Sequence, residues 1–210
     1  MGIVLGLNLP NVITQEVGGE TCVLIQMVDR DPALQQPPPA TSKKLEEHVR
    51  NHPDEVHGAI VFDLFVANND RAFGPERRNL LLDRSGRLLL YDQGNACFYR
   101  CRPAANIQAG IPRLEAVEND LTAMFDMAHK HNNYFGFLDQ WELVRNWCDR
   151  IAKLPDFVIE SIVNRIPEMP RPNSEERQRL CEFLLNRRRY LFDHVVRWQN
   201  QFPGLPTFVE

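Results

Sequence analysis

The feature that most constrains the fold is a pair of short leucine runs separated by a polar turn. Leu80-Leu81-Leu82 and Leu88-Leu89-Leu90 flank the segment Asp83-Arg84-Ser85-Gly86-Arg87. Two short apolar runs around a Ser-Gly turn are typical of a β-hairpin. Because a hairpin brings its two open ends together, the residue before the first run and the loop after the second should be close in space. Asn79 precedes the first run, and Asp92 comes directly off the second strand.

A helix and a polar loop precede this hairpin. The segment from Val56 to Val66 is mostly apolar and lacks proline, which predicts a buried helix ending near Asn68. The turn-forming residue Asn69 and the charged residues Asp70 and Arg71 follow it. The order is therefore helix, polar loop, strand, tight turn, strand and a second polar loop.

This arrangement suits phosphoryl transfer. That reaction needs a carboxylate to orient or deprotonate the attacking hydroxyl, and hard oxygen ligands for nucleotide-bound Mg²⁺. Asp70 suits the first role, while Asn79 and Asp92 suit the second. The structural alternative is a helix-ending turn in which Asp70 pairs with a nearby arginine, and an ordinary turn at Asp92.

The segment NNDRAFGPERRNLLL, followed by LLLYDQG, resembles the catalytic and metal-binding loops of the HipA-like kinases. These belong to the protein kinase-like superfamily and are related to the phosphatidylinositol 3- and 4-kinases. The resemblance implies that Asp70 is the catalytic residue, that Arg71 stabilises the loop or a phosphate, and that Asn79 and Asp92 bind the Mg²⁺ of ATP. It suggests a protein Ser or Thr as the phosphate acceptor, with a lipid head group as the more remote alternative. Eight residues separate Asp70 from Asn79, against four in the protein-kinase loop.

The same resemblance places the adenine beside a hinge at Gln26-Met27-Val28, so Gln26 and Val28 are the expected nucleotide-binding residues. An ordinary strand end is the alternative. Protein kinases also hold the phosphates with a Gly-rich loop and a strand lysine, but the first lysine in this sequence is Lys43. We therefore expect a shortened kinase, a second chain that supplies this half, or an inactive kinase-derived module that binds a nucleotide or a partner.

Strand, linker and helix signals divide the chain into two parts. Residues 1–40 contain two strand-like runs and a Pro-rich linker, and are expected to be the remnant of an N-terminal lobe with its hinge. Residues 41–210 are mainly helical apart from the hairpin, and are expected to be a kinase-like C-terminal lobe. The predicted fold class is α+β and protein kinase-like, with a small incomplete β-containing N-terminal part.

Composition limits the partners. The net charge of −4 gives no reason to expect nucleic acid, and no apolar run approaches the ~18 residues of a membrane span. Five scattered cysteines without a signal peptide predict a reduced, cytoplasmic protein. The expected partners are a nucleotide and a protein substrate or partner, with no membrane.

Several helical features lie outside the candidate site. Apolar spacing predicts a helix over 113–130, and Asn173 with Glu176 predicts a capping box at the start of a long helix. Within that helix, the basic run Arg187-Arg188-Arg189 is expected to be a solvated face, with phosphate or acidic-partner binding as the alternative. His57 is expected to be a surface or capping residue.

Overall fold

The computed structural model describes residues 1–25, 47–48, 50–68, 71, 80–83, 85–91, 93, 96–97, 111–119, 121, 124, 133–166 and 172–209. Within these residues the fold is α+β and mainly helical, as the sequence predicts. The helices are α2 (Pro53–Phe65), α3 (Ile111–Glu118), α5 (Trp141–Ala152), α6 (Asp156–Asn164) and α7 (Ser174–Arg197), with 3-10 turns η2 (Asn133–Phe137) and η3 (Gln199–Gln201). The strands are β1 (Val12–Val17), β2 (Glu20–Ile25), β3 (Leu80–Leu82) and β4 (Leu88–Leu90).

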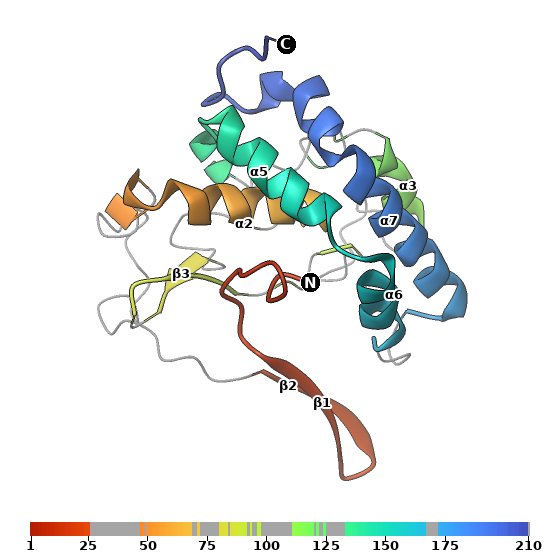
Figure 1. The fold of residues 1–210 in the computed structure, drawn as a ribbon. Coiled ribbons are helices and arrows are strands. Elements are labelled where there is room, and N and C mark those ends of the chain that lie inside the picture. Colours follow the sequence, from red (N-terminus) through yellow and green to blue (C-terminus); the bar gives the residue numbers. More distant parts are fainter. Residues whose placement is uncertain are drawn as a thin grey trace.

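Helix α2 lies at the centre of the fold. Its residues from Val56 to Phe65 are all buried, so the apolar run in the sequence is a helix covered on every side. It packs against α5, α7, η2 and β4, and Figure 1 shows it between α5 and the β3–β4 hairpin. The contact with α5 is close at Gly58, where an added Cβ would lie 2.3 Å from the Trp147 ring.

The predicted hairpin is confirmed. Strands β3 and β4 pair antiparallel, with Leu80 opposite Leu90 and Leu82 opposite Leu88. The Asp83 side chain holds the turn, because its Oδ1 accepts from the backbone N–H groups of Ser85 (2.8 Å) and Arg87 (3.0 Å). The leucines of β4 are buried, and they place the hairpin against α2.

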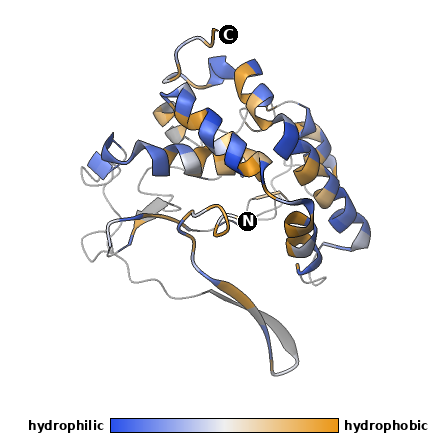
Figure 2. Ribbon diagram, in the orientation of Figure 1, coloured by the Kyte–Doolittle hydropathy of each residue, from blue (hydrophilic) through white to orange (hydrophobic). Residues whose placement is uncertain are grey.

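The C-terminal half is a set of packed helices. Helices α3, α5 and α6 all contact the long helix α7, and blue and orange residues alternate along α5 and α7 in Figure 2, as amphipathic helices require. The predicted capping box of α7 is confirmed, since Asn173 Oδ1 accepts from Glu176 N at 2.8 Å and Glu176 Oε2 accepts from Asn173 N at 3.0 Å. The prediction of one continuous helix over 113–130 is wrong, because α3 ends at Glu118. The carbonyl of the next residue, Asn119, accepts a hydrogen bond from the Arg197 side chain.

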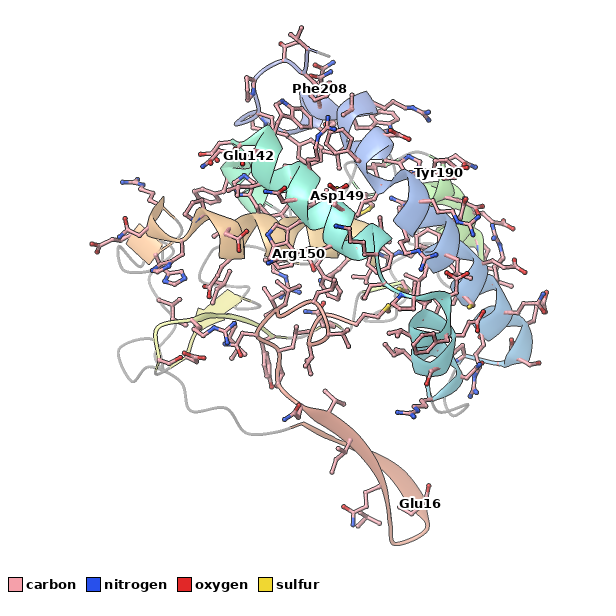
Figure 3. The ribbon with its side chains drawn as sticks, in the orientation of Figure 1. Glu16, Glu142, Asp149, Arg150, Tyr190 and Phe208 are labelled. Carbon is pink, nitrogen blue, oxygen red and sulfur yellow. The ribbon has the colours of Figure 1, made fainter. Side chains whose placement is uncertain are left out.

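The two ends of the chain differ in packing. The β1–β2 hairpin turns at Gly18 and Gly19, both at positive φ, and projects away from the helices in Figure 1. The C-terminal segment instead folds back, so that Phe208, labelled in Figure 3, packs edge-on against Trp141 with ring centroids 5.0 Å apart. Among the described helices, none combines the length and apolarity needed to cross a membrane.

The solvated face expected at Arg187-Arg188-Arg189 is wrong for its first two residues. Arg187 is 1% exposed and Arg188 is 7% exposed, and only Arg189 lies at the surface. Arg188 binds the Leu154 carbonyl and the Asp156 carboxylate, which joins α7 to the start of α6. The run lies where α7 meets its neighbours, so tertiary packing decides its burial.

Candidate functional site

Of the six residues expected at the site, the structure describes Arg71. Asp70, Asn79, Asp92, Gln26 and Val28 lie outside the described residues. The geometry of the candidate site is therefore built from the residues that adjoin Asp70, Asn79 and Asp92 in the chain. These are the end of α2, Arg71, the β3–β4 hairpin and the segment after it.

Arg71 is fully buried and is paired with Asp63 on α2. Its Nε lies 2.7 Å from Asp63 Oδ2, and its Nη2 lies 3.1 Å from Asp63 Oδ1, so both oxygens accept from one guanidinium. Both side chains are 0% exposed. Removing one partner of a buried ion pair typically costs about 3–5 kcal/mol. These two hydrogen bonds join Arg71 to α2.

The remaining arm of Arg71 reaches the segment after the hairpin. Its Nη1 donates to the Tyr91 carbonyl at 2.8 Å. Tyr91 immediately precedes Asp92, and Arg71 immediately follows Asp70. One hydrogen bond therefore joins the chain neighbours of the two expected carboxylates.

A second link runs beside the first. The Nδ2 of Asn68 lies 3.0 Å from Asp63 Oδ1 and 3.3 Å from Gln93 Oε1. Asn68 is fully buried, and its backbone N–H donates to the Asp63 carbonyl at 2.8 Å, which closes the end of the helix. Asp63 thus contacts both Asn68 and Arg71, on either side of positions 69 and 70.

The chain is also held in unusual backbone conformations at this corner. Ala67, at φ 51°, and Cys97, at φ 56°, are the non-glycine residues with positive φ among those that the structure describes. Left-handed backbone is uncommon for residues with a Cβ, and it persists where the surroundings enforce it, often at functional sites. Cys97 N donates to the Val66 carbonyl at 2.7 Å, and Val66 directly precedes Ala67. The two residues with positive φ therefore lie next to the same hydrogen bond.

Two buried arginines face the same corner. Arg113 of α3 donates to the Ala67 carbonyl, and Arg187 of α7 lies close enough to act electrostatically on Cys97. Burial nevertheless raises the pKa of the Cys97 thiol to about 12, because desolvation outweighs the opposing charges of these two arginines. The thiol lies 3.2 Å from the Val66 carbonyl, and its burial and raised pKa are typical of a structural cysteine.

The hairpin register brings the chain neighbour of Asn79 close to the segment that precedes Asp92. Leu80 directly follows Asn79 in the sequence, and it pairs with Leu90, which precedes Tyr91. Backbone pairing thus ends beside the carbonyl that Arg71 binds. The chain neighbours of Asp70, Asn79 and Asp92 form one connected set of contacts.

Sequence reasoning missed the residues that build this corner, most clearly Asp63 and Arg113. A signal for Asp63 was present, because it is a single acidic residue in the apolar run VFDLFV. A charge in a buried helix requires a partner, and Arg71 is the first arginine after it. No comparable local signal marks Arg113, which reaches Ala67 from an element 46 positions away.

Other described parts of the chain offer weaker sites. A pocket of about 260 Å³ lies between the N-terminal segment, α2, β4 and α5, and Arg71 is not among its lining residues. No group of three or more His, Cys, Asp or Glu side chains within the described ranges is arranged to hold a metal ion. No protein-family model, curated protein or solved structure matches this chain.

Proposed function

We propose that the chain is an ATP-dependent kinase domain of the HipA-like type that transfers the γ-phosphate to a hydroxyl, with a protein Ser or Thr as the acceptor. In this proposal Asp70 orients or deprotonates the attacking hydroxyl. Asn79 and Asp92 supply the oxygen ligands for the Mg²⁺ that accompanies ATP, and Gln26 and Val28 lie at the adenine. The protein kinase-like fold and its two-lobe division, at residues 1–40 and 41–210, belong to the same proposal.

The observation that carries the proposal is the 2.8 Å hydrogen bond from Arg71 Nη1 to the Tyr91 carbonyl. In the sequence, Asp70 directly precedes Arg71 and Asp92 directly follows Tyr91, the two residues that this bond joins. Phosphoryl transfer depends mainly on positioning and electrostatic stabilisation. Hydrogen bonds that join the neighbours of both carboxylates to each other and to a buried helix would support the positioning that this chemistry needs.

A specific observation favours a second function, a kinase-derived module that binds a nucleotide or a partner without turnover. The sequence has no lysine before Lys43, whereas protein kinases hold the phosphates with a strand lysine and a Gly-rich loop. We therefore expect the 210-residue protein alone to show very weak autophosphorylation or none. Nucleotide binding through Asn79 and Asp92 would persist.

Incubation with γ-labelled ATP and Mg²⁺ separates these functions. The comparison is between wild type, Asp70→Ala and Asp149→Ala, the last removing an exposed carboxylate from the outer face of α5 (Figure 3). Labelling that is lost in Asp70→Ala and kept in Asp149→Ala would establish a kinase. Absent labelling together with Mg²⁺-dependent ATP binding would favour the non-catalytic module, and absence of both would reject both functions.

A further inference from the structure

Asp63 is a buried charge that binds two side chains just beyond the C-terminal end of α2, those of Asn68 and Arg71. It is 0% exposed, and its neighbours in the helix, Phe62 and Leu64, are apolar and buried. Arg71 contacts both carboxylate oxygens, at 2.7 and 3.1 Å, and Asn68 donates to one of them at 3.0 Å. The bidentate geometry fixes the plane of the guanidinium as well as its distance.

Both partners of Asp63 continue to the segment after the hairpin. Arg71 Nη1 donates to the Tyr91 carbonyl at 2.8 Å, and Asn68 Nδ2 lies 3.3 Å from Gln93 Oε1. Tyr91 and Gln93 are the residues on either side of Asp92. The Asp63 carboxylate therefore binds Asn68 and Arg71, the residues on either side of positions 69 and 70. Through these two side chains it is connected to Tyr91 and Gln93, the residues on either side of Asp92.

We propose that Asp63 is a positioning residue: its carboxylate holds Arg71 and Asn68, and these two side chains fix the distance from α2 to Tyr91 and Gln93. The effect of this positioning on Asp70 and Asp92 rests on the proposed function. The carboxylate is carried by α2, whose residues from Val56 to Phe65 are all buried, and a buried helix is a rigid support for a site. Arg71 is then a positioning residue as well, because each of its three guanidinium nitrogens binds either Asp63 or the Tyr91 carbonyl.

The link between the segments 68–71 and 91–93 is tested by amide hydrogen exchange in Asp63→Asn and Arg71→Lys. The first variant keeps the shape of Asp63 and removes its charge, and the second keeps the charge of Arg71 and removes its planar fork. Arg188→Lys is the matched control, because Arg188 is also buried and also binds one carboxylate and one backbone carbonyl, but joins α6 to α7.

We expect peptides covering residues 66–72 and 90–97 to exchange about tenfold faster or more in both site variants, while α5 and α7 keep their protection. Arg188→Lys should leave both peptides unchanged. Unchanged exchange in the two peptides would overturn the proposal. Uniform loss of protection along the chain in Arg71→Lys, the variant that keeps the charge balance, would also overturn it, because Arg71 would then support global stability only.

Mg²⁺–ATP affinity, measured by calorimetry on the same folded variants, tests the functional consequence. A positioning role predicts that Asp63→Asn weakens affinity about tenfold or more, whereas Arg188→Lys has wild-type affinity. Equal affinity in wild type and Asp63→Asn would overturn the connection to Asp70 and Asp92. If wild type itself does not bind Mg²⁺–ATP, the kinase proposal fails, and the exchange result still decides whether Asp63 joins the two segments.

Discussion

Gly58→Ala should destabilise the protein, although the same change at an open helix position would stabilise it. Replacing glycine with alanine inside a helix is worth about 1 kcal/mol from backbone propensity. Here the added Cβ would lie 2.3 and 2.4 Å from two carbons of the Trp147 ring, far inside the ~3.5–4.0 Å optimum for carbon atoms. Trp147 is 3% exposed, and its indole N–H donates to Asp54, so the ring has little room to move.

The magnitude follows from these opposing terms. Overpacking a well-packed core costs about 1–3 kcal/mol and occasionally more, and the contact at Gly58 is at the severe end of that range. After the propensity gain, we expect a net loss of about 1–2 kcal/mol, which lowers Tm by about 2–8 °C for a chain of this length. Urea and thermal denaturation followed by circular dichroism would measure both quantities.

Trp147→Phe provides the control for this prediction. Phenylalanine lacks the second ring, whose atoms make the closest contacts with the added Cβ. In the Trp147→Phe background, Gly58→Ala should therefore be nearly neutral or stabilising, which gives a coupling energy between the two sites. If Gly58→Ala alone stabilises the wild-type protein by about 1 kcal/mol, as at an open helix position, then Gly58 does not pack closely against Trp147 and the reasoning is refuted.

Three further predictions concern other parts of the fold. His57 is buried, donates from Nδ1 to the Pro53 carbonyl and accepts at Nε2, and burial lowers its pKa against weaker opposing contributions from the Pro53 carbonyl and nearby carboxylates. Because the pKa of His57 is lower in the folded protein than in the unfolded chain, the free energy of unfolding should fall as the pH drops below the unfolded value of about 6.5, by at most about 1.4 kcal/mol per pH unit. His57→Gln should make the free energy of unfolding less dependent on pH, as denaturation between pH 7 and 5 would measure. Cys97, with its raised pKa, should resist iodoacetamide at pH 8.5 in the folded protein and react in urea, as mass spectrometry of its peptide would show. Asn173→Ala removes one half of the capping box with Glu176 and should cost about 1 kcal/mol in urea denaturation, whereas an unchanged midpoint would mean that the cap does not contribute.

The sequence predicted the elements whose signals are local. The β3–β4 hairpin was predictable because its turn chemistry lies within five residues, where Asp83 binds the backbone of Ser85 and Arg87. The capping box at Asn173 was predictable for the same reason, since its two partners are three positions apart. In both cases, the interaction that fixes the structure lies inside the segment that the pattern describes.

The buried charges were not predictable in the same way. Arg187 and Arg188 lie on a helix whose sequence suits a solvated face, and their burial depends on packing against α6 and other neighbours. His57 was expected at the surface or at a cap; it is fully buried, and its Nε2 accepts from the backbone just before α5, 82 positions later in the chain. Local periodicity carries no information about such partners, because they come from elements distant in sequence.

Mg²⁺-dependent ATP binding, measured by calorimetry on wild type and Asp92→Ala, tests the central claim most directly. Asp149→Ala is the control for loss of one carboxylate, because Asp149 lies on the exposed face of α5. We predict that wild type and Asp149→Ala bind ATP only when Mg²⁺ is present, and that Asp92→Ala loses this binding while its circular dichroism spectrum is unchanged. Equal binding by wild type and Asp92→Ala would contradict the account, because the loop joined to Arg71 would then have no part in holding the nucleotide.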